Sequence, residues 1–124
     1  MSPLSRIINF VRPVEGKYVW TNHARMKMRH YRLTESRIIR VLRYPARIEE
    51  GILEGAVACM QSAGGKKYSE IWAMYVLAKA KSKAQNAKQL KIITAWRYPG
   101  KSPERDPIPT EVLREIKGLI FASV

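Results

Sequence analysis

The sequence predicts an α+β domain: two short N-terminal helices, then a curved antiparallel sheet of about four strands, then a C-terminal helix. Three observations lead to this class. Apolar residues recur with helical spacing over residues 22–31 and 35–43, and again from residue 110 onward. Between these segments, strand-like alternation takes over from residue 47 to residue 97. A chain of 124 residues, 46 % of them hydrophobic, suits one compact domain, and strands that follow helices are typical of α+β folds.

The first predicted helix follows a short strand over residues 17–20. Thr21 or Asn22 can cap this helix, because either side chain can accept a hydrogen bond from a free backbone N–H. We expect the helix to continue to about Tyr31, with one stripe of residues toward the core. The residues of that stripe are Ala24, Met28 and Tyr31. A further short helix is expected over residues 3–10.

The second predicted helix covers residues 35–43 and begins after Thr34, which caps it. Tyr44-Pro45 ends the helix, because the residue before proline avoids helical backbone angles. The apolar residues of this helix should point inward, and three arginines should share its outer face. Those arginines are Arg37, Arg40 and Arg43.

The middle of the chain is predicted to form the sheet. The expected strands span residues 47–53, 56–62, 66–79 and 90–97. Gly64-Gly65 is typical of a hairpin turn, and residues 79–89 form a lysine-rich loop. Alternation in the last strand predicts one shared face for Leu90, Ile92, Thr94 and Trp96. We expect Trp72 and Tyr75 in the core.

The C-terminal part is predicted to pack on the same domain. Residues 99–109 hold four prolines and should form an extended linker. Thr110 then caps a final amphipathic helix. The expected organisation is therefore one domain over residues 1–98, with the linker and helix of residues 99–124 packed against it.

Positive charge is concentrated in the first half of the chain, and most of it is arginine. The chain has 23 Lys and Arg against 10 Asp and Glu, and residues 1–48 hold eleven of the bases and two of the acids. The guanidinium fork matches phosphate geometry, so RNA, DNA or an acidic protein is the expected partner. The plainer alternative is a solvated face kept soluble by its charge. The arginines that we expect to bind substrate are Arg25, Arg29, Arg32, Arg37 and Arg40.

The composition excludes several classes of protein. A single cysteine, Cys59, excludes an internal disulfide framework and a cysteine-ligated zinc site, and should fill core space. The longest apolar run, residues 71–78, is too short to span a bilayer, so we expect a cytoplasmic protein with no membrane partner. The chain has no glycine-rich phosphate loop and no histidine pair with metal spacing, so we expect no cofactor and no metal. Its few, scattered acids argue against a two-metal nuclease.

A chain of this composition can still cleave RNA without a metal. The 2′-hydroxyl attacks the adjacent phosphate, a base takes its proton, a cation stabilises the phosphorane, and an acid protonates the leaving oxygen. His23 and His30 are candidates for proton transfer because histidine titrates near neutral pH, and Lys27 is a candidate phosphate ligand. A histidine near a helix start is more often a packing or surface residue, and that reading stands beside the catalytic one. Trp96 can likewise be a core residue or a base-stacking one.

Three short phrases occur in order along the chain. The first is Thr21-Asn22-His23-Ala24 after a strand, with Met28 five residues beyond the histidine. The second is Val41-Leu42-Arg43-Tyr44-Pro45, and the third is Ile93-Thr94-Ala95-Trp96. By these phrases, residues 18–98 resemble small domains related to BrnT-type toxins, within the wider group of RelE, colicin D and barnase-like ribonucleases.

This resemblance implies a RelE-like fold with an active cleft between the first helix and the sheet. It implies that His23 and Lys27 act from the helix. It also implies that Thr94 positions a phosphate oxygen and that Trp96 stacks a base, both from the last strand. Many toxins of this group are blocked by an antitoxin that covers the basic cleft, so an acidic antitoxin is a possible partner.

These observations lead to three hypotheses. The leading one is a metal-independent endoribonuclease of toxin–antitoxin type. The second is a nucleic-acid-binding module without catalysis, favoured because Lys27 and Tyr31 stand where the family usually has arginine. Arg32, which stands where glycine is common, is a further departure from the family's pattern. The third is an interaction protein whose basic face docks an acidic partner. The chain could be a monomer or a homodimer.

Overall fold

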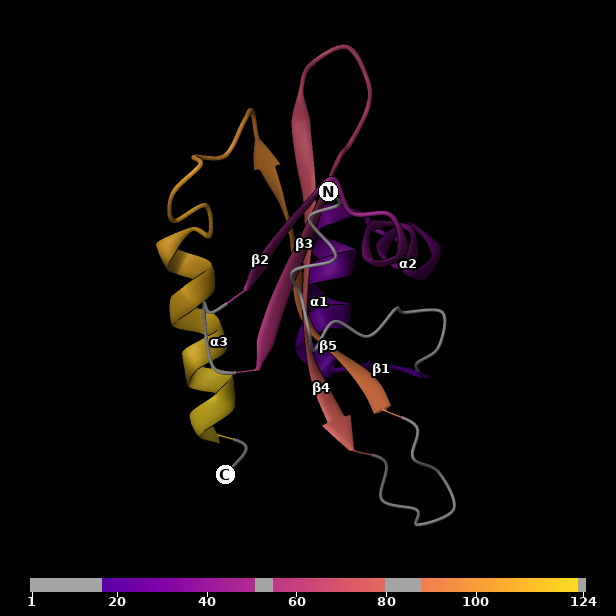
Figure 1. The fold of residues 1–124 in the computed structure, drawn as a ribbon, viewed down its shortest axis with the longest axis vertical. Helices are drawn as coiled ribbons and strands as arrows, with labels where there is room; N and C mark the ends of the chain where they lie inside the picture. The colour runs from indigo at the N-terminus through magenta and orange to yellow at the C-terminus, as the bar shows by residue number, and fades with distance from the viewer. Residues whose placement is uncertain (1–16, 51–54, 80–87, 123–124) are drawn as a thin grey trace, which may run out of the picture.

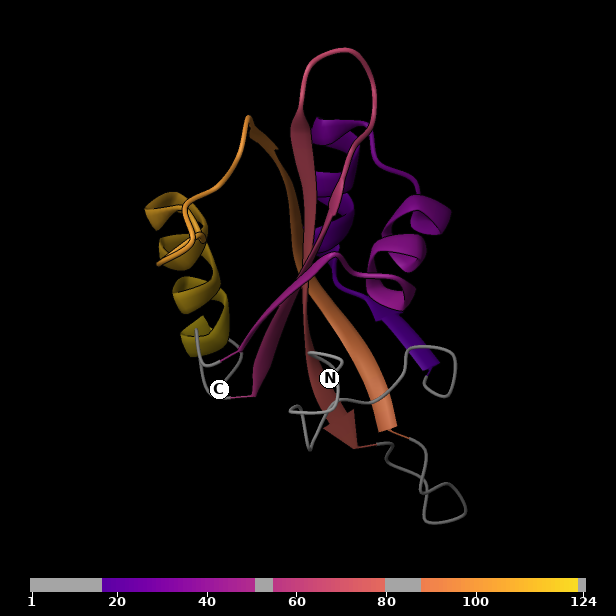
Figure 2. The same ribbon diagram turned by 45° about the horizontal axis from the view of Figure 1, so that its top comes forward.

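The protein has three layers, with a sheet between two helical layers. The computed structural model describes residues 17–50, 55–79 and 88–122. Helices α1 (Asn22–Tyr31) and α2 (Glu35–Arg43) cover one face of the sheet, and α3 (Thr110–Ala122) covers the other (Figures 1 and 2). The predicted α+β class is confirmed. The helix expected over residues 3–10 lies outside the described residues.

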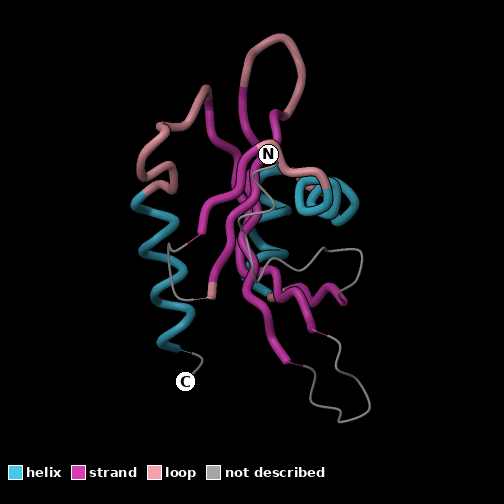
Figure 3. Tube along the Cα trace, in the orientation of Figure 1, coloured by secondary structure: helices cyan, strands magenta, loops and turns pink. Residues whose placement is uncertain are grey.

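The sheet has five strands and is mostly antiparallel. Figure 3 draws its strands in magenta, between the helices in cyan. The strands are β1 (Lys17–Trp20), β2 (Arg47–Glu50), β3 (Ala56–Ser62), β4 (Ser69–Lys79) and β5 (Lys88–Pro99). Their order is β1-β5-β4-β3-β2, and only the β1–β5 pair is parallel. The short strand predicted over residues 17–20 therefore joins the edge of the predicted antiparallel sheet.

The two N-terminal helices begin where the capping residues predict. The Thr21 hydroxyl accepts a hydrogen bond from the Ala24 N–H at 3.1 Å, and the Thr34 hydroxyl accepts one from the Arg37 N–H at 3.1 Å. Helix α1 ends at Arg32, which adopts left-handed backbone angles (φ 57°, ψ 50°). This conformation favours glycine, because a Cβ atom crowds the following carbonyl.

Each face of the sheet carries its own hydrophobic core. The helix-pair core, beneath α1 and α2, is built from Ala24, Met28, Leu33, Ile38, Val41, Leu42, Cys59, Ile71, Ala73, Tyr75, Leu90, Ile92 and Ala95. The α3 core is built from Ala56, Ala58, Met60, Trp72, Met74, Ile93, Trp96, Ile108, Val112 and Ile116. The predicted core positions Cys59, Trp72 and Tyr75 are all buried, and burial raises the pKa of the Cys59 thiol to about 12.

The prediction that Leu90, Ile92, Thr94 and Trp96 share one face of the last strand is wrong. A β-bulge interrupts the β4–β5 pairing: Met74 pairs with Thr94 but the next residue, Tyr75, pairs with Ile92. The extra residue shifts the alternation of side chains between the two faces. Leu90 and Ile92 therefore belong to the helix-pair core, whereas Trp96 belongs to the α3 core.

The proline-rich segment after β5 has no regular secondary structure but is held against the sheet. The buried carboxylate of Glu70 accepts hydrogen bonds from the Ser102 N–H (3.3 Å), the Trp72 indole N–H (3.0 Å) and the Tyr68 hydroxyl (2.9 Å). Burial raises the pKa of Glu70, but these hydrogen bonds outweigh burial and hold the pKa below its ordinary value. Arg47 also donates to the Glu104 carbonyl at 2.7 Å. These contacts fix the segment that leads into α3.

Candidate active site

The N-terminal end of α1 is fixed to β5. The backbone N–H of Thr21 donates to the Ile92 carbonyl at 3.2 Å, and the Thr21 hydroxyl donates to the same carbonyl at 2.8 Å. The threonine thus caps α1 and ties it to the strand beside the bulge. This double anchor fixes the first turn of α1, which carries His23.

His23 and Lys27 meet at one carboxylate of α3. They are four residues apart on α1, so their side chains lie on the same face of the helix. The Lys27 Nζ atom donates to Glu115 Oε1 at 2.9 Å, and the His23 Nε2 atom lies 3.2 Å from Glu115 Oε2. The side chains of His23, Lys27 and Glu115 are 15, 21 and 35 % exposed, so the cluster is largely shielded from solvent.

The contact between His23 and Glu115 is close but not aligned. His23 Nε2 and Glu115 Oε2 are both buried, and neither has a well-oriented hydrogen-bond partner. Reorientation of the His23 ring toward another donor or acceptor loses no hydrogen bond at Nε2, because this atom has none, whereas the Glu115 carboxylate stays bonded to Lys27. The arrangement can therefore hold an anionic oxygen near Lys27 and exchange protons at His23 and Glu115.

Thr94 and Trp96 lie on β5 but are buried. Their residues are only 1 and 2 % exposed, respectively. The Trp96 ring stacks on Trp72, with centroids 5.6 Å apart and planes 4° apart, and the Arg47 guanidinium lies 5.7 Å from the Trp72 centroid. In this arrangement neither Thr94 nor Trp96 offers a surface to a base or a phosphate.

The predicted substrate-binding arginines lie in the layer formed by α1 and α2. Arg25, Arg29, Arg32 and Arg40 are exposed, and Arg37 is half-buried. Arg25 Nη1 donates to Glu35 Oε2 at 2.8 Å. Among the described residues, this is the one ion pair with both members in the α1–α2 layer. The second candidate histidine, His30, is exposed and packs edge-on against Tyr31, at the end of α1 opposite His23.

Sequence reasoning missed Glu115. Its neighbour Ile116 and Val112, one turn earlier, are both buried on the apolar stripe of α3. A carboxylate beside such a stripe is ordinary for an amphipathic helix, so the sequence pattern gives no sign that Glu115 meets a positive partner.

Comparison of the chain with family models, curated proteins and solved structures found no match. The resemblance to BrnT-type toxins therefore stays a prediction. Within residues 17–50, 55–79 and 88–122, no three His, Cys, Asp or Glu side chains group closely enough to hold a metal ion. None of the helices in this part of the chain is long and apolar enough to cross a membrane.

Proposed function

We propose that the protein is a metal-independent endoribonuclease whose active groups are His23, Lys27 and Glu115. One observation carries the proposal. A histidine and a lysine from α1 converge, at 3.2 and 2.9 Å, on a carboxylate from α3. A carboxylate and a phosphate both present negative oxygens to such a pair, so the site is chemically suited to a phosphodiester.

The reaction needs two proton-transfer groups and one positive charge. An RNA 2′-hydroxyl attacks the adjacent phosphorus, and the Glu115 carboxylate takes the hydroxyl proton. The bond between phosphorus and O5′ breaks, and protonated His23 gives its proton to the departing O5′. Lys27 stabilises the extra negative charge of the phosphorane. The products are a 2′,3′-cyclic phosphate and a free 5′-hydroxyl.

Thr94 and Trp96 act, in this proposal, as support for the site. Their burial favours a packing role over the phosphate and base contacts that the resemblance implies. The exposed arginines of α1 and α2 supply affinity for the RNA backbone, because guanidinium groups pair with phosphates.

A cleavage assay on labelled single-stranded RNA in EDTA tests the proposal. We expect cleavage by the wild-type protein with 2′,3′-cyclic phosphate ends, and a loss of 100-fold or more in His23→Ala and Glu115→Gln, since general acid–base groups contribute about 10²–10⁴-fold. His30→Ala and Glu111→Gln are matched controls, because both residues are exposed. Equal cleavage by folded His23→Ala would refute the proposal.

The second candidate is a nucleic-acid-binding module without catalysis. It is favoured by the burial of Thr94 and Trp96, which removes two expected substrate contacts, and by the exposed arginines, which need no catalytic group to bind a polyanion. Salt-dependent binding that leaves the RNA intact under every condition would establish this function instead.

A further inference from the structure

Three arginines gather at the end of α1 opposite His23. Gln61 of β3, Ile71 of β4 and Arg97 of β5 stand opposite one another in register. Paired residues on neighbouring strands project from the same face, and Ile71 belongs to the helix-pair core, so this row faces α1 and α2. Arg37 of α2 reaches the row, since its Nη1 atom donates to Gln61 Oε1 at 2.6 Å.

The side chains of this group are held by neutral oxygens. Arg37 Nη2 also donates to the Ser62 carbonyl at 3.2 Å, and Arg97 Nε donates to the carbonyl of Tyr31, the last residue of α1, at 2.8 Å. Gln61 in turn donates to the carbonyls of Arg40 and Tyr44. The guanidinium groups of Arg37 and Arg97 are thus oriented before any ligand arrives, which lowers the entropy cost of binding.

The positive charges in this cluster are close enough to affect one another. Burial, followed by the charges of Arg40 and Arg97, lowers the pKa of Arg37. Among the ion pairs of the described residues, none includes Arg37, Arg40 or Arg97. Repulsion within such a cluster is relieved when an anion binds between its members.

We propose that Arg37, Arg40 and Arg97 form a binding site for a backbone phosphate of RNA. Arg37 and Arg97 each hold unused guanidinium N–H groups beyond the contacts described, and Arg40 adds an exposed one. The identity of the polyanion rests on the proposed function, but cleavage is not required. The site sits near Tyr31, eight residues and so about 12 Å along α1 from His23. A bound strand of three to four nucleotides spans that distance at the roughly 3.4 Å rise of a stacked strand.

The test measures RNA binding in the non-cleaving His23→Ala background. Fluorescence anisotropy of a labelled single-stranded RNA is followed over a series of KCl concentrations. We expect Arg97→Gln to weaken binding about fivefold and to reduce the salt slope by roughly 0.7, the value for one phosphate contact on a single strand. Arg97→Lys should keep the salt slope but bind more weakly, because lysine lacks the planar fork. Arg105→Gln, an equal loss of charge at an exposed residue before α3, is the control and should change neither value.

The outcomes separate this site from the catalytic proposal. Unchanged affinity and slope in Arg97→Gln and Arg40→Gln, with intact folding by circular dichroism, would overturn the site. Calorimetric binding of inorganic phosphate that Arg97→Gln abolishes, with RNA affinity unchanged, would assign the cluster to free phosphate and also overturn it. If RNA affinity depends on Arg97 while the wild-type protein never cleaves RNA, the site stands and the catalytic proposal fails.

Discussion

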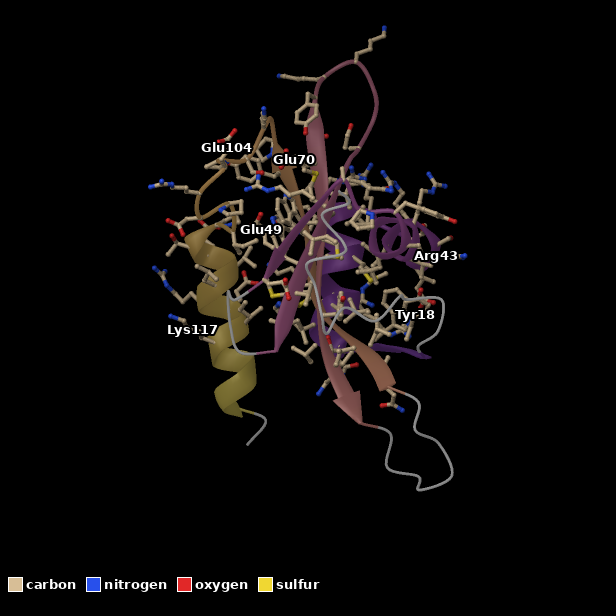
Figure 4. All side chains as sticks on the ribbon, in the orientation of Figure 1. Tyr18, Arg43, Glu49, Glu70, Glu104 and Lys117 are labelled. Carbon is tan, nitrogen blue, oxygen red and sulfur yellow. The ribbon has the colours of Figure 1, made fainter. Side chains whose placement is uncertain are left out.

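The helices on the two faces of the sheet differ in their balance of basic and acidic residues. Residues 22–43, which form the α1–α2 layer, hold seven Lys and Arg against one Glu, whereas residues 99–122, which lead into and form α3, hold four of each sign. Figure 4 shows Glu49, Glu70 and Glu104 on the α3 side of the sheet and Arg43 on the α2 side. Arg47 is neutralised on the α3 side by Glu49 at 2.9 Å.

On one face, the charged side chains find their partners within the chain. The other face carries an excess of positive charge that suits it to binding an anion. On the α3 side, the proline-rich segment accepts hydrogen bonds from Arg47 and donates one to Glu70. On the α1–α2 side, Glu35 is the one acid among residues 22–43, and the exposed arginines are the groups that the proposed RNA ligand would neutralise. His23 and Lys27 stand at the junction, since they belong to α1 but pair with Glu115 of α3.

The largest expected effect on stability comes from emptying the α3 core. Trp96→Ala removes a 2 % exposed ring stacked on Trp72 and should lower the free energy of unfolding by about 3–5 kcal/mol, measured by urea denaturation. Tyr44, which is 65 % exposed at the end of α2, provides the control variant. Tyr44→Ala should lower the free energy of unfolding by less than about 0.5 kcal/mol. Similar losses for the two variants would show that the stack does not support the α3 face.

A smaller effect is expected from the polar network on that face. Glu70→Gln should lower the free energy of unfolding by about 1–3 kcal/mol, because three donors lose a charged acceptor. The pKa of Glu70 is lowered in the folded protein, so its contribution is full above the ordinary value of 4.5 and is lost as pH falls through the folded-state pKa.

Urea denaturation between pH 3 and 7 measures how the contribution of Glu70 to the free energy of unfolding changes with pH. The difference between the wild-type protein and Glu70→Gln should be constant near neutral pH and should shrink as the pH falls below the ordinary pKa of 4.5. Glu104, an exposed carboxylate on the same side, gives the control variant Glu104→Gln. A difference that grows on acidification would contradict the assigned role of Glu70.

The smallest expected effect is a gain in stability, at the end of α1. Arg32→Gly should raise the free energy of unfolding by about 0.5–1 kcal/mol, because glycine adopts the left-handed angles of Arg32 without strain. Arg29→Gly, three residues earlier inside α1, should instead destabilise by about 1 kcal/mol. Thermal melts of both variants distinguish backbone strain at Arg32 from a general effect of glycine.

Features set by neighbouring residues were predictable from the sequence, and features set by distant ones were not. Thr34 and Pro45 define the second helix locally, and the predicted span of residues 35–43 is the observed one. The bulge in β5 was missed because it depends on pairing with Met74 and Tyr75.

The candidate site shows the same limit. The spacing of His23 and Lys27 on one helix is local, and sequence reasoning found the pair. Glu115 and Arg97 join their neighbours only through tertiary contacts, so no local pattern pointed to either residue. Their roles as proposed here require the structure.

The distance along the chain between Lys27 and Glu115 has a consequence for protein synthesis. These residues are 88 positions apart, and ribosomes add about 5–20 residues per second. Each new molecule therefore spends roughly 4–18 s with Lys27 already made and Glu115 not yet translated. During that interval His23 and Lys27 lack their carboxylate, and β5, to which Thr21 anchors α1, is among the last elements made. The completed site is thus a late product of translation.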